Sequence, residues 1–141
     1  FNDFKPFNDI YGFRQGDRAI LIFSELLQKR YPRDSFIAHI GGDDFFVGLT
    51  DFTFEDVFEL TLDIQNEFKY SAKNSYSNKD KELGYIVSKD RFGTTRNFNL
   101  LSVSCAIVEI NCKSNILNFD DTLNIMKKES KSLKEPVYKV L

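Results

Sequence analysis

One glycine-rich stretch constrains the fold more than any other part of the chain. Apolar residues lie on both sides of Gly41-Gly42-Asp43-Asp44. Glycine reaches the positive φ angles that tight turns between antiparallel strands require, because it has no Cβ atom. The stretch therefore predicts a β-hairpin over about residues 35–49, with the two glycines in the turn and the two acids side by side at its tip.

The adjacent acids Asp43 and Asp44 are unfavourable as structure alone. Like charges repel each other and neither side chain adds to a core, whereas a divalent cation makes both favourable. The alternative is a solvated turn, because Gly and Asp are common in turns of every kind. The pattern leaves open a metal-binding hairpin and an ordinary surface turn.

Local signals predict the elements on either side of the hairpin. Residues 2–13 contain Pro6 and Gly12 and predict a binding loop with a short helical turn. Apolar residues recur at helical spacing over 16–30, which predicts an amphipathic helix that ends before Pro32.

The second half of the chain alternates helices and strands. Thr53, with Asp56 as a weak capping box, predicts a helix that continues to about Ala72, and the polar run 73–82 predicts a surface loop. The remaining predictions are a short strand at 85–87, a turn at 90–93, a buried strand at 100–110, a helix at 119–133 and an edge strand at 137–140.

Composition limits the class of protein. The chain has 141 residues, 42% of them hydrophobic, which suits one packed domain. A net charge of −2 gives no positive field to attract nucleic acid, and no membrane span or signal peptide is evident, which predicts a cytoplasmic protein. Cys105 and Cys112 lack the spacing of a zinc site or redox motif and are expected to be reduced.

These features together resemble the GGDEF family, the diguanylate cyclases that join two GTP molecules into cyclic di-GMP. The blocks that carry the resemblance are 41–45, 4–17, 101–104 and 127–131. The resemblance implies a palm-like α/β sandwich of the nucleotidyl cyclase or ferredoxin-like type, with a mixed sheet. The segment 84–104 resembles the GGDEF domains found beside EAL and CBS domains.

The start of the chain falls inside a family motif. Phe1 is not methionine, so we expect residues 1–141 to be a single GGDEF domain that lacks the family's N-terminal helix and first strand. The family's metal-binding aspartate would come just before Phe1. Asn2 takes the place of the second acid of the same Asp-x-Asp pattern.

The resemblance assigns guanine recognition to Asn8 and Asp17. A carboxylate accepts hydrogen bonds from both N1–H and N2–H of guanine, which distinguishes guanine from adenine. The alternative is local, because Asp17 could simply cap its helix and Asn8 a turn.

The resemblance also implies contacts to the rest of GTP. Lys5 and the backbone amides of Asp3 and Phe4 would bind phosphates, and Gly41 and Gly42 would belong to the same substrate site. Two further lysines, Lys127 and Lys131, lie one helical turn apart and match the family's phosphate-binding Lys and Arg. Alone, they would suggest only the solvated face of a helix.

The implied reaction is attack of the 3′-hydroxyl of one GTP on the α-phosphate of another, twice, across a homodimer. Asp43 and Asp44 would be the catalytic residues and the ligands of Mg²⁺ or Mn²⁺. The family has Glu at the position of Asp44, and a misplacement of about 1 Å can cost on the order of a hundredfold in rate. The alternative function is therefore a domain that binds GTP without turnover and regulates an attached EAL, CBS or sensory module.

The family's product-inhibition motif is also altered. An Arg-x-x-Asp motif would require Arg at position 32 and Asp at position 35, where this chain has Pro32 and Ser35. Any cyclase activity is therefore predicted to lack this feedback. His39 could contact a phosphate or simply pack on its strand.

Overall fold

A computed structural model describes residues 1–141 apart from 91, 112–113, 115–116 and 134–135. The chain forms two compact units, the first from Phe1–Thr50 and Ile64–Val103, the second from Asp51–Asp63 and Ser104–Leu141. The long helix α3 (Phe54–Ala72) contributes residues to both. No helix in the described part of the chain is long and apolar enough to cross a membrane.

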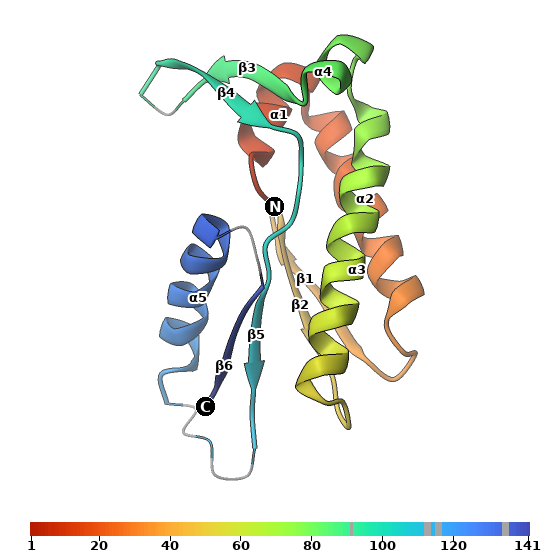
Figure 1. The fold of residues 1–141 in the computed structure, drawn as a ribbon, viewed down its shortest axis with the longest axis vertical. Helices are drawn as coiled ribbons and strands as arrows, with labels where there is room; N and C mark the ends of the chain where they lie inside the picture. The colour runs from red at the N-terminus through yellow and green to blue at the C-terminus, as the bar shows by residue number, and fades with distance from the viewer. Residues whose placement is uncertain (91, 112–113, 115–116, 134–135) are drawn as a thin grey trace. The chain divides into compact units, whose positions relative to one another are not determined.

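The first unit combines helices with two antiparallel strand pairs (Figure 1). Its elements, besides its share of α3, are α1 (Phe4–Tyr11), α2 (Phe13–Arg30), β1 (Phe36–Gly41), β2 (Asp44–Gly48), a 3₁₀ turn (Lys73–Ser75), α4 (Asn78–Leu83), β3 (Tyr85–Lys89) and β4 (Thr95–Asn99). Strand β1 pairs with β2, and β3 pairs with β4. Together with the second unit this gives a mixed α/β protein, as the sequence predicts.

The loop predicted for residues 2–13 is wrong, because most of this segment is helix α1. Pro6 lies in the first turn, where a helix does not need its backbone N–H groups for internal hydrogen bonds. Gly12, at φ 83°, then separates α1 from α2. Helix α2 consequently begins at Phe13, three residues before the predicted start, and it ends at Arg30 as predicted.

The hairpin is confirmed, but its turn lies one residue later than predicted. Strand β1 ends at Gly41, which pairs with Asp44, so Gly42 and Asp43 form the turn. Gly42 has a φ of 57°, the left-handed conformation that glycine adopts without a clash. The strand register shifts between His39 and Gly41, and this irregularity moves the turn.

Residues 73–82, predicted to be a surface loop, form a 3₁₀ turn and helix α4. Ser77 caps α4, since its hydroxyl accepts a hydrogen bond from the Asp80 amide at 3.2 Å. The Tyr11 hydroxyl donates to the Asp80 carboxylate and accepts from the Ser77 amide at 3.2 Å. The polar sequence of this segment predicts a loop by itself, but contacts with α1 hold part of it as a short helix.

The predicted strand at 100–110 is wrong in its first half. Only β5 (Ala106–Glu109) is a strand, while Ser102 forms an isolated bridge with Asn2. Side chains satisfy the backbone here, because the Tyr76 hydroxyl accepts from the Leu101 amide at 2.8 Å and Gln65 donates to the Val103 carbonyl at 3.0 Å.

The strand predicted at 85–87 is confirmed as β3, but its partner β4 was not predicted. The sequence of β4, Thr-Arg-Asn-Phe-Asn, is largely polar and exposed and shows no apolar alternation. The predicted turn between the two strands is present, and the Asp90 carboxylate accepts from the amides of Phe92 and Thr94. Arg91 lies outside the described residues.

The second unit contains β5, α5 (Phe119–Leu133) and β6 (Val137–Val140), and the bounds of α5 and β6 match the prediction. Strands β5 and β6 are parallel, and α5 packs beside them (Figure 1). The start of α3 joins them, since the rings of Phe54 and Tyr138 lie 3.8 Å apart. Cys105 is a free thiol whose pKa is raised to about 11 by burial, and Cys112 lies outside the described residues.

Candidate functional site

An aromatic cluster holds the elements of the predicted site together within the first unit. Phe23 of α2 contacts Phe45 of β2 and Phe68 of α3, with ring centroids 5.1 and 5.0 Å apart. The ring of Phe1 lies 5.3 Å from that of Phe23 and 4.9 Å from that of Phe68. Burial of such large apolar rings fixes the hairpin and the segment before α1 against the same helices.

The turn residue Asp43 lies beside the beginning of the chain. Its Oδ2 atom is 2.9 Å from the α-amino nitrogen of Phe1, and its carbonyl oxygen accepts from the same nitrogen at 3.3 Å. The Asp43 side chain remains 32% exposed. The segment that leads into α1 and the carboxylate at the hairpin tip are therefore neighbours.

Asn8 of α1 packs against Gly16 of α2 in the predicted guanine site. A Cβ atom at position 16 would lie 2.0 Å from Asn8 Oδ1, so only glycine leaves room for this side chain. Asn8 Oδ1 is buried and has no hydrogen-bond partner among the residues that the structure describes. A buried carbonyl oxygen without a donor is costly, which makes this atom a candidate contact for a ligand N–H group.

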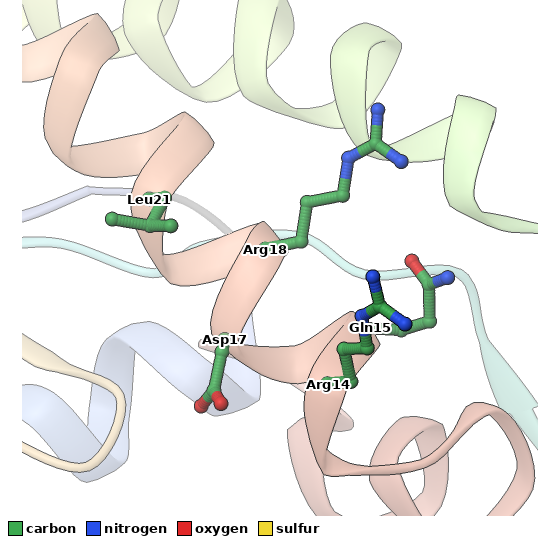
Figure 2. Close-up of a pocket in the computed structure, with 5 residues that line it drawn as sticks. All are labelled: Arg14, Gln15, Asp17, Arg18 and Leu21. Carbon is green, nitrogen blue, oxygen red and sulfur yellow. The ribbon is translucent and has the colours of Figure 1, made fainter.

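Asp17 follows Gly16 on α2 and is exposed. It lines a cavity of about 540 Å³ together with Arg14, Gln15, Arg18 and Leu21 (Figure 2). The Asp17 carboxylate points to the opposite side of the helix from the two guanidinium groups (Figure 2). Asp17 makes no side-chain cap, because Gly12 takes the N-cap position of α2, and the local alternative for Asp17 is therefore wrong.

The residues predicted to bind phosphate in the first unit lie at the start of α1. Asp3 is the N-cap residue with a left-handed backbone (φ 57°), and Phe4 begins the helix. Lys5 is exposed, and its Nζ atom forms an ion pair with Asp9 at 2.9 Å. An exposed pair of this kind is weak, so an incoming phosphate can replace Asp9 as the partner of Lys5.

The hairpin carries the other predicted residues. Asp44 is the first residue of β2 and is half-buried, so the two acids occupy different positions, one in the turn and one in the strand. His39 stacks on Phe45 with ring centroids 4.6 Å apart, and its Nε2 lies 2.9 Å from the Gly42 carbonyl oxygen. These contacts favour a packing role for the histidine.

The predicted lysines of α5 belong to the second unit. Lys127 is half-buried and Lys131 is exposed one turn later. The buried Ser130 lies between them and donates to the Lys127 carbonyl at 3.2 Å. The structure thus confirms that both lysines are on one helix.

Comparison with known families decides the classification. A family model described as diguanylate cyclase, GGDEF domain, matches residues 1–91, which include α1, α2 and the Gly-Gly-Asp-Asp hairpin. The chain belongs to the GGDEF family. No solved structure matches it at a significant level.

Two curated relatives of this GGDEF domain are much longer proteins. The uncharacterized membrane protein SERP0413 of Staphylococcus epidermidis is 29% identical over 97 residues, which cover 62% of this chain and 26% of the relative. The signaling protein YkoW of Bacillus subtilis is 40% identical over 50 residues, covering 36% of this chain and 6% of the relative. The chain therefore spans about a quarter or less of the length of these relatives.

The two hairpin acids of the GGDEF domain suit a magnesium ion. Mg²⁺ is commonly held by one or two carboxylates together with water and substrate phosphates, and Asp43 and Asp44 supply two carboxylates. Among the described residues there is no group of three or more His, Cys, Asp or Glu side chains that could hold a metal ion. The residues present fit a cation that relies on its substrate for the remaining ligands.

Sequence reasoning missed two features of this GGDEF domain. Gly16 leaves room for the Asn8 side chain, and this role depends on contact between two helices. The only sequence signal for it is that a glycine precedes Asp17. The Gln15 side chain also has a buried oxygen, Oε1, to which no described residue donates a hydrogen bond. A polar residue in an amphipathic helix gives no sign of such burial.

Proposed function

We propose that this GGDEF domain binds GTP through Asn8 and Asp17 and forms one half-site of a diguanylate cyclase. Two such domains would condense two GTP molecules into cyclic di-GMP. The observation that carries the proposal is the buried Asn8 Oδ1 atom, which has no hydrogen-bond partner among the described residues. It packs against Gly16, the residue before the exposed Asp17.

Guanine has the donors that these two side chains lack. The base presents N1–H and N2–H as adjacent donors, whereas adenine has an acceptor in place of N1–H. Asp17 would accept from the Watson–Crick edge and Asn8 Oδ1 from an amino hydrogen. A buried unpaired oxygen costs about 1–3 kcal/mol, and pairing it on binding would recover part of that cost.

The remaining site residues suit the triphosphate. Lys5 and the backbone amides of Asp3 and Phe4 would hold phosphate oxygens, Gly41 and Gly42 would allow close approach of the hairpin, and Lys127 and Lys131 would add positive charge. Asp43 and Asp44 would hold Mg²⁺ or Mn²⁺, which neutralises phosphate charge and acidifies a bound hydroxyl. Because each domain presents one substrate, a homodimer is needed to bring the 3′-hydroxyl of one GTP to the α-phosphate of the other.

The second candidate function is a GTP-binding domain that no longer catalyses the reaction. Asn2 favours it, because its amide group donates a hydrogen bond to the Ser102 hydroxyl at 3.0 Å in a position where the family has an acid. Asp44 favours it as well, since its carboxylate is one methylene shorter than that of the family's glutamate. Such a domain would act in the cytoplasm on an attached EAL, CBS or sensory module.

Binding and turnover are tested separately on the full-length protein that contains this chain. Calorimetry should show stronger binding of GTP than of ATP, and Asp17→Ala should weaken GTP binding by about 1–3 kcal/mol, the usual size of a bidentate base contact. Asp34→Ala, which removes an exposed acid between α2 and β1, serves as the control. Equal affinities for GTP and ATP in the unaltered protein would refute guanine recognition.

Incubation with GTP and Mg²⁺ then separates the two candidate functions. Formation of cyclic di-GMP supports the cyclase. Selective GTP binding without product supports the regulatory domain.

A further inference from the structure

We propose that Arg14, Gln15 and Arg18 form a phosphate-binding site on α2 that is separate from the guanine contact at Asp17. The three residues line the 540 Å³ cavity described above. Their side chains extend to one side of the helix, and the Asp17 carboxylate points to the other (Figure 2). We call these three residues the arginine site.

The two arginines are one helical turn apart, and both are exposed. Among the residues that the structure describes, neither forms an ion pair, in contrast to Arg30 and Arg96, which pair with Glu67 and Asp90. Two guanidinium groups on one side of a helix repel each other unless an anion lies between them. Their planar donor groups match the oxygens of a phosphate.

Gln15 distinguishes the arginine site from an ordinary solvated face. Its Oε1 atom is buried and has no donor in the described part of the chain, although it belongs to a side chain on the cavity wall. A phosphate group that retains one proton meets both requirements of the site. Its unprotonated oxygens accept from Arg14 and Arg18, and its P–O–H group donates to Gln15 Oε1.

The position of Arg14 adds to the attraction for an anion. Arg14 is the second residue of the 18-residue helix α2, where the aligned peptide dipoles contribute a partial positive charge. Leu21, 61% exposed, also lines the cavity. The arginine site therefore suits a small phosphate compound. Asp17, which is assigned to guanine, lines the same cavity, but its carboxylate points away from the two guanidinium groups (Figure 2).

The comparison of phosphate with sulfate tests the arrangement directly. Sulfate has a similar size and tetrahedral shape but carries no proton at pH 6, whereas a large share of phosphate groups does. The full-length protein would be labelled with ¹⁵N-arginine and ¹⁵N-glutamine, and the side-chain N–H signals of Arg14, Gln15 and Arg18 would be followed in an NMR titration. We expect saturable shifts with phosphate, at a Kd of about 1 mM, and binding of sulfate at least about fivefold weaker.

Three variants make the result specific. Arg14→Ala combined with Arg18→Ala should abolish the saturable shift of the Gln15 signals, whereas Arg33→Ala combined with Lys69→Ala, two exposed charges elsewhere in the first unit, should leave it unchanged. Gln15→Met removes the acceptor and should abolish the preference for phosphate over sulfate. The backbone amide spectrum of each of the three variants shows whether the fold is retained.

The proposal fails if the shifts increase linearly with anion concentration, if the arginine double variant responds like its control, or if sulfate binds as well as phosphate. It is also separable from the proposed function. Asp17→Ala should lose the preference for GTP but keep the phosphate response of Gln15, and loss of that response would show that there is only one site.

Discussion

Asn8 Oδ1 and the backbone of Gly16 are packed so closely that a Cβ atom at position 16 would lie 2.0 Å from the oxygen. The same Cβ would lie 2.9 Å from Asn8 Cγ and 3.1 Å from the ring of Phe4, so both side chains would have to shift. This contact joins α1 to α2, and the buried Asn8 oxygen has no hydrogen-bond donor among the described residues. The lack of a side chain at Gly16 is thus what allows Asn8 to pack against α2.

Replacement of Gly16 by alanine should therefore destabilise the protein, although Gly→Ala usually stabilises a helix interior by about 1 kcal/mol. We expect a loss of about 1–3 kcal/mol of unfolding free energy, as is typical of overpacking, and GTP binding at least about tenfold weaker because Asn8 is displaced. Urea unfolding and calorimetry measure the two effects. Combining Gly16→Ala with Asn8→Ala should restore stability but not GTP affinity, and Gln28→Ala on the same helix is the control.

Lengthening the acid at position 44 should affect turnover more than binding. Asp44→Glu in the full-length protein should raise the rate of cyclic di-GMP formation at least about tenfold, equal to about 1.4 kcal/mol of barrier, because a group that acts in the transition state is moved into reach. GTP affinity, measured by calorimetry, should change little because the proposed guanine contacts lie on α1 and α2. An unchanged or lower rate would show that the shorter acid is not what limits catalysis.

Product accumulation should not slow any cyclase activity of this protein. Pro32 and Ser35 occupy the positions of the family's inhibitory Arg and Asp, and the Ser35 amide donates to the Pro32 carbonyl at 3.0 Å in a tight turn. Neither side chain can bind a cyclic dinucleotide as an ion pair. Progress curves with added cyclic di-GMP should coincide with those without it, and strong non-competitive inhibition that disappears when the Tyr31–Phe36 segment is altered would contradict the prediction.

Lowering the pH should remove part of the stability that α4 gains from its hydrogen bond to Tyr11 of α1. The hydrogen bonds from Tyr11 and Ser77 lower the pKa of Asp80 from its ordinary value of 3.8. A carboxyl group whose pKa is lowered in the folded state contributes its full stabilisation of the fold at pH values above its pKa in the unfolded state. This contribution is lost as the pH falls through its pKa in the folded state. At pH 7, Asp80→Asn should cost about 1 kcal/mol of unfolding free energy.

The difference in unfolding free energy between Asp80→Asn and the unaltered protein, measured by urea unfolding, should shrink as the pH falls below about 4. Tyr11→Phe removes the hydrogen-bond donor and should weaken this pH dependence. A difference that stays constant from pH 7 to pH 3 would show that Asp80 is not held by these bonds.

The elements predicted correctly from the sequence are those whose signals lie within a few residues of each other. Thr53 and Asp56 mark the start of α3, and their reciprocal hydrogen bonds form the expected capping box at 3.2 and 3.3 Å. Helix α5 and strand β6 follow apolar spacing, and the hairpin follows its glycines. The identities of Asn8, Asp17, Asp43 and Asp44 as site residues come from the same kind of local motif, and their roles stay predictions.

Tertiary contacts decided the rest. Helix α4 depends on Tyr11, the irregular backbone before β5 depends on Tyr76 and Gln65, and the burial of Asn8 Oδ1 depends on Gly16. Each of these relations joins residues on different elements, and a polar side chain has the same sequence signal whether it faces water or a neighbouring helix. The sequence motif identified the residues of the candidate site. Only packing determined which of their polar atoms lack a partner among the described residues. Burial depends on the residues that surround an atom in space and not on its neighbours in the chain.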